Sequence, residues 1–183
     1  ASYASKELAA VGGVGEFVPV IPTAEKGIVD QVAEAVERAI SSGYDGLIIP
    51  GWFPGQENIK KAVQKGVKVM LWLTGCVNNT SNGCPQDKCE DYDYAVAQGY
   101  GINDSQPSDW WKGNGIQIDF TSQEATDWWY QQLDKVYRDG IYGFKVDQGE
   151  VYFGDTVTTS LGTMSNADFR PYYYNAMERY IAS

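Results

Sequence analysis

The sequence predicts an α/β fold in which strands and helices alternate along one domain, residues 1–183. Three observations predict this class. Short apolar runs typical of buried strands alternate with longer segments whose apolar residues recur at helical spacing. Glycine and proline separate most of these segments. The 183 residues, 43% of them hydrophobic and 14% aromatic, are enough for one domain with its own core.

The first half of the chain predicts two strand–helix units. A strand over Glu16–Ile21 precedes a helix over residues 28–40, in which apolar side chains recur every three or four positions. A second strand over residues 47–49 is followed by a short helix over residues 57–64. Gly66 follows that helix, where a glycine commonly adopts the left-handed conformation that ends it.

The third unit contains a long interruption. Residues 67–73 predict a strand buried on both faces, as parallel strands commonly are. Residues 74–119 predict a long loop of the functional type, because they are rich in Gly, Asn and Ser and hold all three cysteines. A capping box over residues 121–124 then begins a helix that Gly140 ends.

The fourth unit has a strand over residues 143–146, a loop over residues 148–165 and a last helix near residues 168–181. Four such units without antiparallel signals predict a parallel sheet with right-handed crossovers. The sheet fits either half of a TIM-type (βα)8 barrel or an open, doubly wound, flavodoxin-like sheet. Four units cannot close a barrel, which needs about eight strands. A half-barrel leaves a strand edge exposed, so we expect a homodimer.

Charge and composition exclude several classes of function. The net charge of −10 argues against nucleic acid and anionic membranes as partners, since both need clustered Lys and Arg. The chain has no histidine, which excludes catalysis by Ser-His-Asp and Cys-His groups. Acid–base chemistry therefore depends on carboxylates, Lys, Tyr or Cys. An acidic, aromatic surface suits a neutral carbohydrate, and no cofactor is expected.

The cysteines lie close together in the sequence, at Cys76, Cys84 and Cys89. Their spacing lacks paired CxxC elements and a fourth ligand, so a zinc site or another metal site is not expected. Two alternatives remain open: one disulfide with one free thiol, and three reduced thiols. No apolar run reaches transmembrane length, so we expect a soluble protein. Its compartment stays open, with a secreted or periplasmic one favoured. Three matches to the N-glycosylation pattern begin at Asn78, Asn79 and Asn103.

The segment that carries most information is residues 143–150, GFKVDQGE. A short apolar strand ends in Asp147, a glycine follows, and Glu150 comes three residues after the aspartate. In βα architectures the C-terminal ends of parallel strands carry the chemistry. From position alone, Asp147 is either a turn or helix cap or a catalytic group.

A family resemblance decides between these interpretations. From about residue 66 to residue 183 the chain resembles glycoside hydrolase family 31, the retaining α-glycosidases. The resemblance depends on four segments in the family's order: residues 65–73 (KGVKVMLWL), residues 93–101 ending in QGYG, residues 118–122 (IDFTS) followed by Trp128-Trp129, and residues 143–150.

The resemblance implies a role for three strand residues. Asp147 would be the nucleophile that attacks the anomeric carbon and forms a glycosyl-enzyme intermediate. Lys145, two residues earlier on the same strand face, would contact the sugar and help keep Asp147 ionised. Trp72 would line the sugar pocket at the end of the third strand. The substrate would be an α-glycoside such as an α-glucoside.

Four further residues have two interpretations each. Glu150 belongs to the matched motif and either contacts the sugar or orders the loop, the second being favoured. Trp110 and Trp111 either line the pocket or pack in the core or loop. Asp119 is interpreted as a structural cap beside Thr121 in preference to a catalytic group.

The sequence also departs from the family. A retaining glycosidase needs a second carboxylic acid, roughly 5–5.5 Å from the nucleophile, to protonate the leaving group. In the family this acid lies well after the nucleophile strand, and the sequence ends one helix after Asp147. Hydrolysis is therefore expected to be weak or absent for this chain alone. Asp155 could serve as the acid, but the resemblance does not support it.

The first 65 residues fit the family poorly. Residues 28–49 resemble instead a lobe of a periplasmic sugar-binding protein, and residues 58–66 continue as its next helix. This resemblance predicts a junction near residue 66 and a hybrid, natural or engineered. Two alternatives to a glycosidase therefore stay open: a non-catalytic carbohydrate-binding α/β module, and a scaffold without activity.

Overall fold

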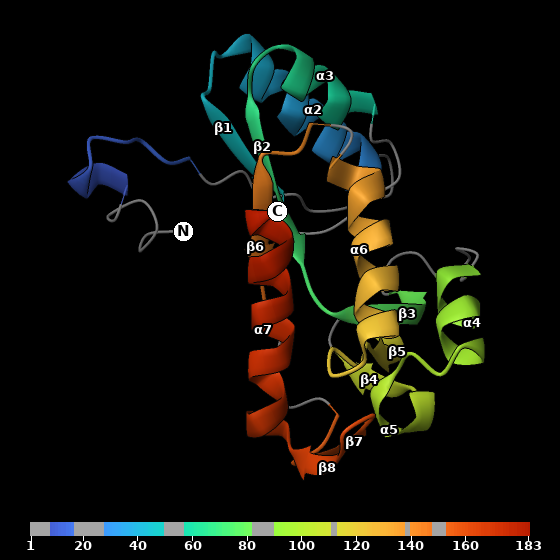
Figure 1. Ribbon diagram of the computed structural model, residues 1–183. Coiled ribbons are helices and arrows are strands. Elements are labelled where there is room, and N and C mark those ends of the chain that lie inside the picture. Colours follow the sequence, from blue (N-terminus) through green and yellow to red (C-terminus); the bar gives the residue numbers. More distant parts are fainter. Residues whose placement is uncertain are drawn as a thin grey trace. The chain divides into compact units, whose positions relative to one another are not determined.

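The computed structural model describes residues 8–16, 28–49, 57–81, 90–110, 113–137, 140–147 and 153–183 (Figure 1). The chain divides into two compact units, and each is described by itself. The first is formed by residues 1–47 and 52–69, and the second by residues 48–51 and 70–183. The predicted strand over Glu16–Ile21 lies outside the described residues from residue 17 onward.

The first unit is built around two neighbouring helices (Figure 1). Its elements are α2 (Ile28–Ser41), the beginning of β1 (Gly46–Ile49), α3 (Glu57–Gln64) and the beginning of β2 (Lys68–Leu73). Val36 of α2 and Ala62 of α3 are buried, and Glu37 forms an ion pair with Lys61 between the two helices. The start of β2 bonds to the start of β1, because the Lys68 N–H donates to the Asp45 carbonyl at 3.0 Å.

Helical periodicity and glycine punctuation predicted this unit well. The helices expected over residues 28–40 and 57–64, and the strand over residues 47–49, agree with α2, α3 and β1 to within one residue at each end. Gly66 has φ of +83°, so it adopts the left-handed conformation that the sequence predicts after α3.

The second unit contains a parallel strand pair, β2 with β6 (Gly143–Val146). The register pairs Met70 with Gly143 and Leu73 with Val146. Helix α7 (Asn166–Ala182) runs along β6 (Figure 1). The parallel strands and the flanking helices confirm the predicted α/β class.

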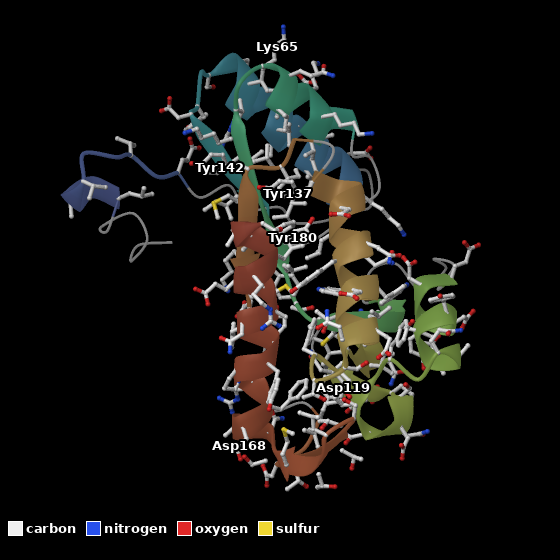
Figure 2. The ribbon with its side chains drawn as sticks, viewed as in Figure 1. Lys65, Asp119, Tyr137, Tyr142, Asp168 and Tyr180 are labelled. Atoms are coloured by element: carbon white, nitrogen blue, oxygen red, sulfur yellow. The ribbon has the colours of Figure 1, made fainter. Side chains whose placement is uncertain are left out.

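Side chains of β6 alternate between a covered and an open face. Phe144 is buried, with its ring centroid 6.5 Å from that of Tyr180 on α7 and 6.3 Å from that of Tyr137 on α6 (Gln123–Tyr137). Tyr137 and Tyr180 are labelled on these two helices in Figure 2. Successive strand residues point to opposite faces. Lys145 therefore points away from the helices, and its side chain is 52% exposed.

The prediction that residues 67–73 are buried on both faces is wrong. Val69 and Leu71 are buried, whereas Met70 and Trp72 are only partly covered. An uninterrupted apolar run cannot reveal which of its faces is covered, because Met and Trp also occur on partly exposed strand faces that bind ligands.

The described part of residues 74–119 consists largely of strands and helices, so the prediction of a long loop is also wrong. It contains an antiparallel sheet of strand order β3-β5-β4 and two helices. The elements are β3 (Cys76–Ser81), α4 (Glu90–Ala97), α5 (Ile102–Ser105), β4 (Ser108–Trp110) and β5 (Gly113–Gln117). A β-bulge interrupts the pairing of β3 with β5 between Asn78 and Thr80.

The segment over residues 148–165 likewise contains an antiparallel hairpin, β7 (Thr156–Thr159) with β8 (Gly162–Ser165). We expected a sheet without antiparallel pairing, and the β3-β5-β4 sheet and the β7–β8 hairpin both contradict this expectation. The predicted capping box at Thr121 is wrong: Ser122 caps the helix and accepts a hydrogen bond from the Ala125 N–H at 3.3 Å, whereas the Thr121 hydroxyl donates to Asp119.

The core of the second unit lies between α6, α7 and the strands. Its members with at most 3% exposure include Leu71, Ile116, Ile118, Phe120, Ala125, Leu133, Phe169, Tyr173, Ala176 and Met177. Among the helices of the described segments, none combines the length and the apolar character needed to cross a membrane.

Candidate active site

Asp147 stands directly after β6, where the parallel pair ends. Its N–H donates to the carbonyl of Leu73 at 2.9 Å, so the ladder between β2 and β6 continues through this residue. Lys145 is the register partner of Trp72. Because strand side chains alternate, Lys145 and Asp147 share the face opposite Phe144. The predicted strand-tip position of Asp147 is therefore observed.

The carboxylate of Asp147 receives two donors from this face. The indole N–H of Trp72 donates to Oδ2 at 2.8 Å, and the ammonium of Lys145 forms an ion pair with the same oxygen. Hydrogen bonds to an ionised acceptor are stronger than those between neutral groups, and both contacts favour the charged carboxylate. The Asp147 side chain is 34% exposed and so remains accessible to a ligand.

Tyr173 of α7 supports Asp147 from the main chain. Its hydroxyl donates to the Asp147 carbonyl at 3.0 Å, and the Leu73 carbonyl lies 3.4 Å from the same hydroxyl. Burial raises the pKa of Tyr173 well above its usual value, so the hydroxyl keeps its proton and stays a donor. Tyr173 appeared in the sequence only as part of the apolar face of the last helix.

The aromatic side of the site is formed by two stacked indoles. The rings of Trp72 on β2 and Trp110 on β4 have centroids 6.3 Å apart and an interplanar angle of 12°. Trp110 is 8% exposed, and its N–H donates to Oδ1 of Asn78 on β3 at 2.8 Å. The parallel pair and the antiparallel sheet therefore meet at this stack. Trp111 and Glu150, the other predicted site residues, lie outside the described residues.

The chain matches the model of the family described as "Glycosyl hydrolases family 31 TIM-barrel domain" over residues 47–182. The chain belongs to glycosyl hydrolase family 31. The resemblance inferred from the four segments is thereby confirmed, and the match favours a barrel sheet over an open, doubly wound one. The matched range also includes residue 66, the predicted junction. The hybrid origin remains a prediction.

Three relatives illustrate the similarity. An isomaltosyltransferase from Sporosarcina globispora is 33% identical over 117 residues, which are 60% of this chain and 10% of that protein. A cycloalternan-forming enzyme from Listeria monocytogenes, solved with a pentasaccharide substrate, has a TM-score of 0.60 and 22% identity, covering 83% of this chain and 19% of that one. A cycloalternan-degrading enzyme from Trueperella pyogenes, solved with a covalent intermediate, has a TM-score of 0.60 and 16% identity, covering 97% and 31%.

These shares show that the chain spans about a tenth of the length of the curated relative. The two solved structures, both under 25% identical, establish the likeness of fold. In this family 31 domain, the residues that the sequence singled out can now be placed one by one.

Asp119 has the contacts of the structural cap beside Thr121 that the sequence analysis favoured. The residue is 5% exposed. Its Oδ1 accepts hydrogen bonds from the N–H and the hydroxyl of Thr121, and its Oδ2 accepts from the Ser160 N–H at 2.7 Å. Asp119 lies near the N-terminal end of α6 (Figure 2). It therefore joins the start of α6 to the β7–β8 turn.

Asp155, the alternative acid, is an exposed residue directly before β7. Its main-chain oxygen accepts from the Asn166 N–H at 2.8 Å. Among the described residues, three or more His, Cys, Asp or Glu side chains do not gather in a group that could hold a metal ion.

Cys76 is a free cysteine whose thiol donates to Oε1 of Gln117 at 3.2 Å. Burial raises the pKa of this thiol to about 12. It is therefore not a thiolate at neutral pH and does not act as a nucleophile. Cys84 and Cys89 lie outside the described residues, so whether these two form a disulfide stays open.

Asn103 uses its side chain within the fold. Its amide nitrogen donates to the Phe153 carbonyl at 3.2 Å, and its Oδ1 accepts from the Thr158 N–H at 2.8 Å. Asn103, Asp104 and Ser105 all have φ between 54° and 56°, a left-handed conformation that costs roughly 1–3 kcal/mol for residues other than glycine. The two hydrogen bonds of Asn103 offset part of that cost. They also anchor residues 153 and 158, in the segment that follows β6.

Proposed function

We propose that this chain is the part of a family 31 catalytic barrel that carries the retaining nucleophile, and that Asp147 is that nucleophile. Its contacts with Trp72 and Lys145 at the C-terminal ends of two parallel strands carry the proposal. Parallel-barrel enzymes place their chemistry at this end. The names of the relatives, an isomaltosyltransferase and cycloalternan enzymes, support an α-glucoside as the substrate.

The chemistry assigned to Asp147 is a double displacement. A carboxylate oxygen forms a bond to the anomeric carbon while the bond to the leaving oxygen breaks, and that oxygen takes a proton from a general acid. Water then attacks the same carbon, loses a proton to the conjugate base and regenerates the carboxylate. The covalent intermediate captured in the Trueperella relative supports a mechanism of this type.

Lys145 and Trp72 prepare Asp147 for the first step. Lys145 supplies positive charge beside the carboxylate, and the indole N–H of Trp72 fixes the direction of one oxygen. The nucleophile is then ionised and oriented before the sugar arrives, so little reorganisation remains for the transition state. Lys145 is 52% exposed, which leaves its ammonium within reach of a sugar hydroxyl.

We assign the acid/base role to none of the described carboxylates. In the half-barrel interpretation this chain alone is weakly active or inactive toward natural glycosides, whose leaving groups need protonation. Glycosides with activated leaving groups escape this need. The proposal therefore predicts that nucleophilic attack can be observed in this chain even if complete turnover is slow.

The decisive experiment traps the intermediate. The chain is incubated with 5-fluoro-α-glucosyl fluoride, whose leaving group departs without a proton, and the adduct is located by peptide mass spectrometry. We expect one glycosyl adduct, on Asp147, and no labelling of Asp147→Asn. The control Asp93→Asn, an exposed carboxylate of α4, should be labelled at the wild-type rate.

The outcome also separates this proposal from its alternatives. Reversible binding of glucose oligomers that survives Asp147→Asn, without any adduct, would support a carbohydrate-binding module built on the exposed part of the Trp72 and Trp110 stack. A chain that neither binds sugar nor forms an adduct would be a scaffold without activity. Either result would overturn the assignment of Asp147 as nucleophile.

A further inference from the structure

A continuous series of contacts runs from the antiparallel sheet to the proposed nucleophile. Asn78 accepts a hydrogen bond from the Trp110 indole, Trp110 stacks on Trp72, and Trp72 donates to Oδ2 of Asp147. The two hydrogen bonds are each 2.8 Å long, which is a good length for an N–H donor. The series therefore joins two sheets that are separate in hydrogen bonding.

Trp72 needs an external support to hold its N–H in one direction. Its side chain projects from the open face of β2 and is only partly buried. An indole with freedom at both side-chain torsions would donate to Asp147 for part of the time only. Stacking on a second aromatic ring restricts that freedom, and aromatic pairs contribute about 0.5–1.5 kcal/mol beyond their burial. Trp110 supplies the second ring.

Trp110 is itself fixed by Asn78 and by the local geometry of β3. A bulge follows Asn78 and changes the register of β3 against β5, and bulges redirect nearby side chains. The register partner of Asn78 is Gly115, where an added Cβ would lie 2.9 Å from Oδ1 of Asn78 and would also meet the Val77 carbonyl. Only glycine leaves room for the Asn78 amide at this position.

We propose that Asn78 and Trp110 are positioning residues for the glycosidase reaction, holding the Trp72 indole so that it orients the nucleophile Asp147. This inference depends on the proposed function of Asp147. It adds two residues of the antiparallel sheet that act on the carboxylate through Trp72. Since Trp72 and Lys145 both contact Oδ2, fixing the indole also fixes the plane of the carboxylate and the direction of Oδ1.

The competing explanation is that Asn78 and Trp110 only stabilise the antiparallel sheet. In that case their removal lowers the free energy of unfolding but leaves every folded molecule with a normal site. The two explanations predict different rates of attack by Asp147 within folded molecules. They also differ in whether a change at residue 78 alters the surroundings of the Trp72 indole.

The kinetic test compares Asn78→Leu with Asn78→Asp. Leucine removes the acceptor for Trp110, whereas aspartate keeps an oxygen in the same place. We expect Asn78→Leu to lower the maximal rate of labelling by 5-fluoro-α-glucosyl fluoride about fivefold, as for the loss of one net hydrogen bond. Half-saturation by the reagent should change little, and Asn78→Asp should recover most of the rate. The matched control is Asn79→Leu, at the exposed neighbouring position on β3.

Trp110→Phe tests the same hydrogen bond from the side of its donor. Phenylalanine keeps a ring against Trp72 but cannot donate to Asn78, so its rate should match that of Asn78→Leu. The double variant should be no slower than either single variant, because both changes break one connection. Additive losses in the double variant would contradict a connected series.

A second readout does not need activity. Indole N–H resonances of the six tryptophans are observed in a ¹⁵N–¹H NMR spectrum and assigned by single Trp→Phe changes. Asp147→Asn should shift the Trp72 resonance. Asn78→Leu should shift both the Trp110 and the Trp72 resonances, whereas Asn79→Leu should shift neither. A Trp72 resonance unchanged by Asn78→Leu, together with a normal labelling rate, would overturn the proposal.

The two readouts distinguish the two proposals. If the wild-type chain forms no adduct, the nucleophile assignment fails, and the NMR shifts still test whether Asn78 controls the Trp72 indole. If the adduct forms on Asp147 but Asn78→Leu changes neither rate nor resonance, the nucleophile stands and the positioning role fails. Circular dichroism at each step confirms that the variants are folded.

Discussion

The phenolic hydroxyl of Tyr173 lies 3.0 Å from the main-chain oxygen of Asp147, and this contact joins α7 to the end of β6. The Leu73 carbonyl, at the end of the neighbouring strand, is 3.4 Å away. A hydroxyl has one proton, so the shorter contact is the principal hydrogen bond. One fully buried side chain thus contacts the ends of both parallel strands.

Removing this hydroxyl should destabilise the second unit. We expect Tyr173→Phe to lower the free energy of unfolding by about 1–2 kcal/mol, because the Asp147 carbonyl loses its hydroxyl donor in a site closed to water. Urea denaturation followed by circular dichroism measures the change. Tyr172→Phe, at the exposed neighbouring position, is the control and should stay within about 0.5 kcal/mol of wild type. Equal stability of the two variants would contradict the bridging role.

Burial of the Cys76 thiol predicts a specific dependence of stability on pH. The thiol has a reference pKa of 9.0, and burial raises it to about 12 in the fold. The stability contributed by the neutral thiol is therefore fully present below pH 9.0 and is lost as the pH rises toward 12. Within this window the loss should approach about 1.4 kcal/mol per pH unit.

The comparison that isolates this effect uses a background chain with Cys84→Ser and Cys89→Ser. This chain is compared with the same chain carrying Cys76→Ser as well, whose serine does not ionise in the window. The free-energy difference between them, measured by denaturation, should stay constant up to about pH 9 and then move in favour of the serine variant. A constant difference at higher pH would show that the thiol is not buried.

The sequence predicted the grouping of the candidate site residues better than it predicted the antiparallel sheet beside them. Asp147, Lys145 and Trp72 were predicted from strand position and family resemblance, and the structure brings all three together. Helices α2, α3, α6 and α7 and strands β2 and β6 were readable from apolar periodicity and short apolar runs.

The antiparallel sheet was not readable in the same way. β3 is CVNNTS and β5 is GNGIQ, segments rich in Asn, Ser and Gly that have low intrinsic strand preference. Their pairing depends on the close backbone approach that Gly115 permits, which is a tertiary property. Asn78 therefore appeared in the sequence only as a glycosylation match, and its contact with Trp110 was missed.

The β7–β8 hairpin did carry a readable signal. Apart from Met164, the residues of TVTT and GTMS are β-branched or small, and a two-residue turn followed by Gly162 joins the two strands. The surrounding polar residues caused it to be interpreted as loop.

Asp119 should prove structural when it is removed. Asp119→Ala deprives the Thr121 and Ser160 N–H groups of their acceptor, so we expect the free energy of unfolding to fall by about 2 kcal/mol or more. The rate at which folded molecules label Asp147 should stay within about twofold of wild type. Abolished labelling in a folded Asp119→Ala chain, measured by mass spectrometry, would instead indicate a catalytic carboxylate.

The homodimer expected from the half-barrel interpretation remains a prediction, and the second unit offers a surface for it. An apolar groove beside β6 is lined by Val146, Tyr174, Met177, Glu178, Ile181 and Ala182. Tyr174 and Ile181 are 40% and 48% exposed. Burying such a face stabilises association by about 25 cal/mol per Å².

Light scattering should give twice the chain mass. The double variant Tyr174→Asp with Ile181→Asp should be a monomer, because two buried like charges oppose pairing. The control Val96→Asp changes an exposed apolar position on α4 and should leave the dimer intact. A monomeric wild-type chain would contradict the half-barrel interpretation.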